Sequence, residues 1–436
     1  MGRPVSFRYE RDVLPSGLRV VTVETPHLHS ALLTVFLRTG SRHETPVTNG
    51  VGHMLEHLFF RGSEAYPDPV AMNAAIEEIG GNLNGVTMRD HGLYDTVVAP
   101  DGLPVAMRIL GDMLSRPLLS NLEVERSIIL EEMLDEVDEH GRDIDVDNLS
   151  KMVLFGAHPM GMKIAGTTDT VRSLTDEMVR THLQRHYVTG NLVVCATGRV
   201  EHARVLELAA SSFAALPRGP SNEEVAPVLE RVGPRFSFTE HDEAQTSFRL
   251  TFTAMPEPHP DFPALQLLRR VLDDGLSSRL PHEVVEKRGL AYSIQAALEV
   301  YHDVGLFEVD GACAPERTAA VLETTFEVLG RLCDEGPTEA ELARARRRHR
   351  IFNDFAQDSP GELSGWFGAT ELFRRPESLE ARARVIDATG AADVQRVARK
   401  YLTRDNLLVV AVGPRKGVKE LEKVVTRATA LPATAP

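Results

Sequence analysis

The feature that most constrains the fold is an internal repeat. Residues 187–198 read YVTGNLVVCATG, and residues 401–413 read YLTRDNLLVVAVG. Each copy has a Tyr, a hydrophobic residue, a Thr, a short polar turn and an Asn, followed by an apolar run that ends in Gly. A helical pattern precedes each copy, and an amphipathic helical pattern follows it. Because the copies begin 214 residues apart in a chain of 436 residues, the sequence predicts two homologous halves.

The local patterns give both halves the same order of elements. In the first half, GLRVVTVET and SALLTVFLRTG are typical of paired strands, and a helix is expected from about Gly50. In the second half, SFRLTFTAM followed by PALQLLRRVLD repeats the order of strand and helix. The predicted fold class is α+β, with two halves that each combine a mostly antiparallel sheet with helices on one face. We place the first domain at 1–216, a linker rich in Pro, Gly and charge at 217–234, and the second domain at 235–436.

The charge and the distribution of apolar residues exclude several classes of protein. A net charge of −15 repels the nucleic-acid backbone. The basic run 344–350 has acidic flanks and is more typical of a solvated helix face. No run approaches the roughly 18 apolar residues that a membrane span needs, and the N-terminal residues lack the pattern of a secretion signal. The cysteines Cys195, Cys313 and Cys333 lie far apart in apolar segments, which favours buried thiols. We expect a soluble cytoplasmic protein that binds neither nucleic acid nor membranes.

Three ionisable residues interrupt the apolar stretch GVGHMLEHLFFRGS, residues 50–63. On a helix, which turns by about 100° per residue, His53 and His57 lie about 40° apart on one face. Two imidazoles so placed can bind one metal ion, and Glu56 borders that position without having to ligate it. His-x-x-Glu-His is the inverted form of a zinc-protease motif, and the second half has none at the corresponding place. Such a short motif is also common as the polar edge of a buried helix, so a metal site requires a further ligand.

An acidic helical stretch, NLEVERSIILEEMLDEVDEH, offers that ligand. A catalytic zinc ion usually has three protein ligands and keeps one position for water. Glu125 and Glu132 are seven residues apart, within about 20° of one helix face, whereas Glu131 is rotated by about 100° from Glu132. Zinc held by two His and one Glu lowers the pKa of a bound water to about 7. Glu56 could then accept the proton of that water as a general base.

These residues resemble the signature of the pitrilysin/insulysin group of zinc metallopeptidases, the inverzincins. Within that group the chain is most similar to bacterial relatives of the mitochondrial processing peptidase β subunit. The family's ligand Glu follows the motif at a spacing that this chain matches, with 74 residues between His57 and Glu132. The resemblance implies that His53, His57 and Glu132 bind one Zn²⁺ per chain, and that Glu56 is the catalytic base. It also implies that Glu125 is a second acidic residue that supports the site.

The resemblance extends along nearly the whole chain. GGNLNGVTMRDHGLYDTVV, residues 80–98, is similar to a family segment in which an edge strand receives the substrate as an added strand. Asn84 is the substrate-binding residue that this segment implies, and Gly85 stands where the family usually has Ala. DDGLSSRLPHEVVEKRGLAYSI is similar to a segment in which active relatives use an Arg and a Tyr to bind the substrate carbonyl. Tyr292 is the implied catalytic Tyr, but Val285 replaces the Arg and cannot donate a hydrogen bond to an oxyanion.

The implied function is that of a zinc metalloendopeptidase that hydrolyses unfolded peptides or short polypeptides in a chamber closed by two chains. The missing Arg favours a heterodimer in which a homologous subunit supplies an Arg–Tyr pair, and lineage variation within a homodimer is the other explanation. A non-catalytic or partner-dependent, peptide-binding subunit of a heterodimeric peptidase is the alternative function. The intact His-x-x-Glu-His motif argues against that alternative.

Overall fold

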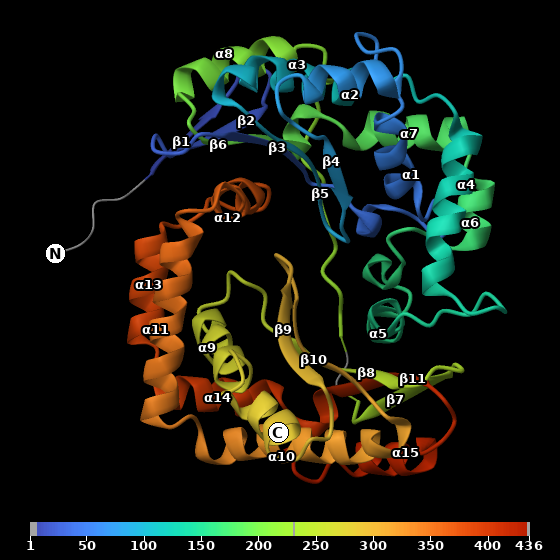
Figure 1. Ribbon diagram of the computed structural model, residues 1–436, viewed down its shortest axis with the longest axis vertical. Coiled ribbons are helices and arrows are strands. Elements are labelled where there is room, and N and C mark those ends of the chain that lie inside the picture. Colours follow the sequence, from blue (N-terminus) through green and yellow to red (C-terminus); the bar gives the residue numbers. More distant parts are fainter. Residues whose placement is uncertain (1–6, 230–231, 434–436) are drawn as a thin grey trace. The chain divides into compact units, whose positions relative to one another are not determined.

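The computed structural model describes residues 7–229 and 232–433, which form two compact units (Figure 1). Unit 1 contains the residues up to Leu134 together with Met162–Val225 and Asn353–Pro376. Unit 2 contains Asp135–Gly161, Ala226–Phe352 and the residues from Glu377 on. Each unit is built around one β-sheet, so the boundary between the units is crossed several times by the chain.

Unit 1 has a six-stranded sheet with the order β1-β2-β6-β3-β5-β4. β2 and β6 are parallel, and the other neighbours are antiparallel. The strands are β1 (Arg8–Val13), β2 (Arg19–Glu24), β3 (Ala31–Leu37), β4 (Asn84–Thr87), β5 (Gly92–Val98) and β6 (Leu192–Gly198). The helices are α1 (Val51–Phe59), α2 (Pro69–Glu77), α3 (Leu103–Ser115), α4 (Leu122–Glu132), α6 (Thr168–Ser173), α7 (Asp176–His186), α8 (His202–Ser212) and α12 (Pro360–Ser364).

Unit 2 has a five-stranded sheet with the order β7-β11-β8-β10-β9. The strands are β7 (Arg235–Glu240), β8 (Thr246–Ala254), β9 (Ser293–Val300), β10 (Gly305–Cys313) and β11 (Leu407–Gly413). The helices are α5 (Val146–Phe155), α9 (Phe262–Leu272), α10 (Thr318–Glu335), most of α11 (Glu339–Ala356), α13 (Leu379–Ala388), α14 (Ala391–Tyr401) and α15 (Val418–Arg427). Without β1, the sheet of unit 1 has the same order, and the parallel pair β7–β11 matches β2–β6. The predicted fold class of two homologous α+β halves is confirmed.

Both faces of the unit 1 sheet are covered. β3 and β6 are buried along their whole length, which requires apolar partners on each side. Alternate residues such as Val35 and Val194 belong to the main core, in which α3 and α8 pack on the sheet. The opposite side chains contact the segment that begins with α12, since a Cβ on Gly368 would lie 2.5 Å from Phe36 and 2.8 Å from Cys195. This covering helix comes from the C-terminal half of the sequence.

The sheet of unit 2 has the equivalent arrangement. Leu154 and Phe155 of α5 pack in one apolar cluster with Leu408 and Val410 of β11. The intervening residues of β11, such as Val409, belong to the main core together with α9 and α14. α5 precedes the linker in the sequence, so each unit takes one helix from the other half of the chain. In the described part of the chain, the helices expected on one face of each sheet are therefore joined by helical segments on the second face, α5 in unit 2 and α12 with the π-helical Gly365–Ala369 in unit 1.

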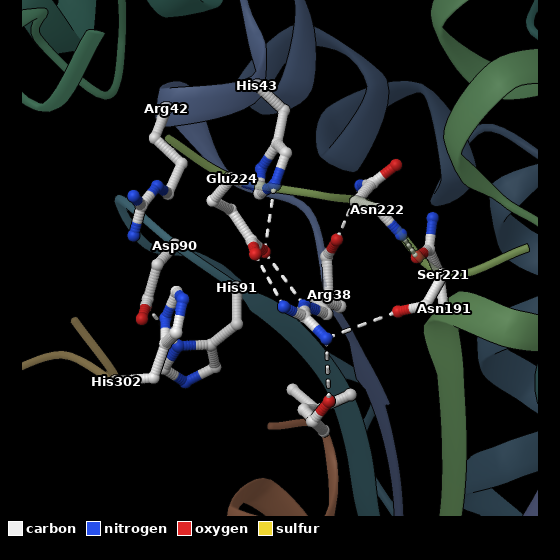
Figure 2. Close-up of polar contacts among 12 residues, drawn as sticks. Arg38, Arg42, His43, Asp90, His91, Asn191, Ser221, Asn222, Glu224 and His302 are labelled. Atoms are coloured by element: carbon white, nitrogen blue, oxygen red, sulfur yellow. Dashed lines mark hydrogen bonds and ion pairs between the residues drawn. The ribbon is translucent and has the colours of Figure 1, made fainter. Parts of the chain in front are cut away.

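Residues 217–225, the first part of the predicted linker, lie in unit 1. Arg38, which follows β3, forms a two-pronged ion pair with Glu224 at 2.7 and 2.5 Å, and His43 Nε2 lies 3.3 Å from the same carboxylate (Figure 2). The backbone N–H of Asn222 donates to Asn191 Oδ1 (2.7 Å), and its side-chain amide donates to the Arg38 carbonyl (2.6 Å). These contacts fix the segment against the end of β3. Residues 230 and 231 of the predicted linker lie outside the described residues.

The remaining general expectations concern cysteines and membrane spans. Cys195, Cys313 and Cys333 are buried free thiols, as predicted. Within residues 7–229 and 232–433, no helix combines the length and the apolar character that a bilayer span requires.

Candidate metal centre

The helix α1 places the His-x-x-Glu-His motif at the surface of unit 1. It begins after Gly50, whose φ of 92° is left-handed and therefore favours glycine. Its apolar residues are buried and pack towards α7, α4 and β4; they are Val51, Met54, Leu55, Leu58 and Phe59. His53, Glu56 and His57 are only half-buried on the remaining side of the helix. The apolar face thus holds the helix in place, and the polar face is left for chemistry.

The structure brings His53, His57 and Glu132 together. Glu132 is the last residue of α4, which packs against α1. Its carboxylate oxygens lie 3.9 Å from His53 Nε2 and 3.6 Å from His57 Nε2. One ligand atom from each residue falls within 4.8 Å of the others. Two imidazoles and one carboxylate form a donor set that zinc accepts, so the residues present fit a zinc ion.

Different surroundings make His53 and His57 suitable as metal ligands: burial keeps His53 neutral, and a hydrogen bond orients His57. Burial, followed by the charge of His57, lowers the pKa of His53 to about 4. His53 is therefore a neutral imidazole near pH 7, the form that binds metals. His57 Nδ1 lies 3.0 Å from Glu125 Oε2, and Glu125 is buried and also paired with Arg61. That hydrogen bond turns His57 Nε2 towards Glu132, as carboxylates commonly do for metal-ligating histidines.

Glu56 lies on α1 one residue before His57. The Thr87 hydroxyl donates to Glu56 Oε2 at 2.5 Å. Burial raises the pKa of the Glu56 carboxyl, while the bond to Thr87 and the charge of His57 oppose that rise. Gly85 leaves room for this side chain, because a Cβ there would lie 3.0 Å from Glu56 Cγ and 3.1 Å from the ring of Phe60. A carboxylate with a raised pKa beside a metal site is suited to proton transfer.

Two family models and several known proteins match this chain. The family model described as "Insulinase (Peptidase family M16)" matches residues 19–168, and that described as "Peptidase M16 inactive domain" matches residues 173–348. An uncharacterised zinc protease of Streptomyces coelicolor is 32% identical over 415 residues, which cover 93% of this chain and 90% of the relative. The chain belongs to the M16 peptidase family. The resemblance to the pitrilysin/insulysin group is thereby confirmed.

Other M16 relatives cover most of the chain as well. An uncharacterised zinc protease of Mycobacterium tuberculosis is 34% identical over 410 residues (90% of this chain, 91% of the relative). The mitochondrial-processing peptidase subunit beta of Dictyostelium discoideum is 29% identical over 420 residues (92% and 88%). A protease from Helicobacter pylori has the same fold, with a TM-score of 0.86 at 22% identity over 94% of this chain and 100% of that chain. The match to the M16 model called inactive, residues 173–348, lies outside the segment that carries His-x-x-Glu-His.

Asn84 is the first residue of β4, the edge strand of the M16 sheet in unit 1. Its side-chain amide donates to Asp95 Oδ1 of the neighbouring β5 at 3.0 Å. β4 pairs with β5 on one side only among the described strands. Val86 and Met88 are exposed on or beside this edge. Since Thr87 of the same strand bonds to Glu56, the edge strand lies directly beside the motif.

Tyr292 belongs to unit 2, whereas the other predicted site residues of this M16 chain belong to unit 1. It precedes β9 and is 93% exposed. Val285 lies in the π-helical segment Pro281–Glu286 and packs against the core of unit 2. The position that holds an Arg in active relatives of the resembled group is thus filled by a half-buried apolar side chain.

Sequence reasoning missed three polar residues that contact the motif, its helix or the supporting Glu125. They are Thr87, which bonds to Glu56, Arg61, which pairs with Glu125, and Glu44, which bonds to the N-terminus of α1. Arg61 lies four residues after His57, just beyond the end of α1 at Phe59, so helical periodicity could have predicted that it lies on the side of His57. Thr87 and Glu44 reach α1 from other elements, and no local pattern points to them.

Proposed function

We propose that this chain is a zinc-dependent endopeptidase in which His53, His57 and Glu132 hold one Zn²⁺ and Glu56 transfers protons. The observation that carries the proposal is the convergence of the three ligand atoms within 4.8 Å, beside a carboxylate held by Thr87. Bound zinc would supply Lewis acidity towards the scissile carbonyl and lower the pKa of water to about 7. Glu56 accepts a proton from that water and donates it to the leaving amine.

The substrates that fit this site are unfolded peptides or short polypeptides. A peptide that pairs with the free edge of β4 must be extended, because strand addition uses its backbone N–H and C=O groups. Asn84 at the start of β4 is our proposed substrate-binding residue. A folded protein cannot present such a strand without unfolding locally.

We further propose that the active species is a dimer, either of two copies or with a homologous subunit that bears the Arg–Tyr pair. Val285 cannot stabilise a developing oxyanion, and the exposed Tyr292 alone supplies a hydroxyl. The second candidate function, a partner-dependent or non-catalytic subunit, is favoured by this same substitution. The complete set His53, Glu56, His57 and Glu132 favours the catalytic reading.

The first test separates metal binding from catalysis. Glu56→Gln should retain stoichiometric zinc and lower the cleavage rate of a quenched unstructured peptide by about 100-fold or more, because only proton transfer is removed. His57→Ala should lose both zinc and cleavage. Zinc is measured by elemental analysis and cleavage by fluorescence.

Neighbouring glutamates on α4 provide a matched control. Glu132→Gln should weaken zinc binding strongly, whereas Glu131→Gln, an exposed residue outside the ligand set, should change neither zinc content nor cleavage. If the Glu56→Gln variant cleaved the peptide at the wild-type rate, the mechanism would be wrong.

The second test concerns the partner. The chain is purified alone and together with a homologous subunit encoded by a neighbouring gene, and both preparations are assayed. We expect cleavage from the pair to exceed that of the lone chain. Efficient cleavage by the lone chain would overturn the requirement for a second type of subunit.

A further inference from the structure

Glu44 is a buried carboxylate that the proposed mechanism does not use. It is 5% exposed and accepts three hydrogen bonds at the start of α1. Its Oε2 accepts from the Gly50 backbone N–H (2.7 Å) and the Asn49 side-chain amide (2.9 Å), and its Oε1 accepts from the Gly52 backbone N–H (2.8 Å). Gly52 is the residue directly before His53.

These bonds replace a cap that α1 lacks. Gly50 occupies the N-cap position and has no side chain to bond to the first helical N–H groups. The carboxylate of Glu44 reaches them from outside the helix, and negative charge at a helix N-terminus is favourable. Gly52 permits the approach, since a Cβ there would lie 2.9 Å from Glu44 Oε1. Both carboxylate oxygens act as acceptors, which is the pattern of the ionised form, although burial raises the pKa of Glu44 to about 7.

The loop that carries Glu44 is itself fixed. Arg38 and His43 contact the Glu224 carboxylate on the side of the linker segment (Figure 2). The backbone N–H groups of Ser41 and Arg42 donate to the carbonyls of Met88 (3.2 Å) and Arg89 (2.8 Å), which follow β4. These contacts hold the loop of Glu44 in place within unit 1, so its carboxylate has a fixed position at the start of α1.

The two metal-ligating histidines differ in how they are oriented. His57 Nδ1 has Glu125 at 3.0 Å, but His53 Nδ1 is buried and has no hydrogen-bond partner among the described residues. In the described part of the chain, no hydrogen bond to Nδ1 therefore fixes the direction of the His53 ring. Its direction depends on the rotation and position of the first turn of α1, which Glu44 holds through Gly50 and Gly52.

We propose that Glu44 is the positioning residue for the metal ligand His53, acting through the backbone of α1 as Glu125 acts on His57 through its ring. This inference rests on the proposed zinc site and extends it to a residue outside the motif. Loss of the Glu44 bonds would let the first turn rotate or fray, and His53 Nε2 would then no longer meet His57 and Glu132.

The test measures metal binding rather than cleavage. Zinc affinity is obtained by competition with a chelating dye, and the geometry of the site is followed by the visible absorption of the Co²⁺-loaded protein. Glu44→Gln, which keeps the size of the side chain but replaces one acceptor by an amide NH₂, should bind zinc about 10- to 100-fold more weakly. Its Co²⁺ spectrum should differ from that of the wild type.

A matched control removes a cap elsewhere in unit 1. Asp68 caps α2 by accepting from the Ala71 N–H at 2.9 Å, so Asp68→Ala should lower the melting temperature by about 2–4 °C. It should leave zinc affinity and the Co²⁺ spectrum unchanged. Gly52→Ala is a second test that keeps the carboxylate and favours helix formation, yet its Cβ displaces Glu44 Oε1. It should reproduce the weaker binding if Glu44→Gln does not fold.

The outcomes are separable. If the wild type binds zinc and both Glu44→Gln and Gly52→Ala bind it equally well with the same Co²⁺ spectrum, Glu44 only stabilises the fold and the inference is wrong. If the wild-type chain binds no zinc, the proposed function itself fails.

Discussion

Thr87 and Glu56 meet across 31 positions of sequence, and their 2.5 Å hydrogen bond is the contact that fixes the proposed base. Thr87 ends β4, so the strand that we propose to receive the peptide also holds the carboxylate that acts on it. Gly85, two residues earlier, leaves the space that Glu56 occupies. A single short strand therefore couples the position of the substrate to that of the base.

Removal of the Thr87 hydroxyl should reduce turnover without loss of metal. A hydrogen bond to a charged group contributes about 1.5–3 kcal/mol, so Thr87→Val is expected to lower kcat about tenfold or more. Thr87→Ser retains the hydroxyl and should restore most of the activity. Peptide cleavage and zinc content are measured for both variants, and equal kcat values for the Val and Ser variants would contradict the role of this bond.

Among the helices of unit 1, α7 packs against the motif helix α1. It carries His182 and His186, which are buried with ring centroids 4.5 Å apart. His186 Nδ1 contacts Asn222 Oδ1 at 3.0 Å. Burial lowers the pKa of His186 to about 4, the bond to Asn222 opposes that shift, and the charges of His43 and Arg185 add to it. Protonation of these buried histidines is therefore unfavourable in the folded protein.

Acid should destabilise the protein through this helix. Unfolded His186 binds a proton near pH 6.5, whereas the folded form binds it only near pH 4. Its contribution to stability is intact above pH 6.5 and is lost as the pH falls towards 4, by about 1.4 kcal/mol per pH unit. His186→Gln should flatten the dependence of the free energy of unfolding on pH between 6.5 and 4.5.

The measurement is urea unfolding at several pH values in the presence of a chelator, so that metal binding does not contribute. His140, an exposed histidine, provides the control, and His140→Gln should keep the wild-type slope. The same slope in wild type and His186→Gln would show that His186 is not responsible.

At the scale of the whole molecule, the two halves exchange equivalent helices. α5 is held in unit 2 by Lys151, which is fully buried. The Lys151 ammonium lies 2.7 Å from Glu308 and 3.2 Å from Asp147, and it also pairs with Glu299. These three carboxylates lie close enough to bind a cation. The Lys151 ammonium contacts all three, and Arg249 also pairs with Asp147 and Glu308. Burial alone would lower the pKa of Lys151, but the three carboxylates raise it above its usual value.

Loss of this buried charge should be costly. Lys151→Met removes the nearer of the two cations beside the buried Glu308 and leaves only Arg249 at 3.6 Å. Breaking one side of a buried ion pair costs about 3–5 kcal/mol. The exposed pair between Lys423 and Glu420 offers a control, since Lys423→Met should change stability by less than about 1 kcal/mol. Both are measured by thermal and urea unfolding. A cost for Lys151→Met no greater than that of Lys423→Met would contradict the proposed anchoring of α5.

Features that depend on short-range periodicity and on repetition could be predicted from the sequence. The 3.6-residue period predicts that His53 and His57 share one face of a helix, and the repeat of residues 187–198 at 401–413 predicts two similar sheets. The spacing of Glu125 and Glu132 places both on one face of α4. Each of these follows from backbone geometry over one or two helical turns, or from copying of a whole half.

Packing between distant elements selects which groups reach the motif and how the halves share their helices, and the sequence did not predict either. Thr87 and Glu44 approach α1 from a strand and a loop, and these contacts depend on packing between elements that leaves no periodic signal in the sequence. The exchange of α5 and α12 could not be predicted either. The pattern of an amphipathic helix shows that one side is apolar, but it does not show which sheet that side covers. The reason is physical: hydrophobic burial is non-directional, so the choice between equivalent surfaces is made by the packing of the whole chain.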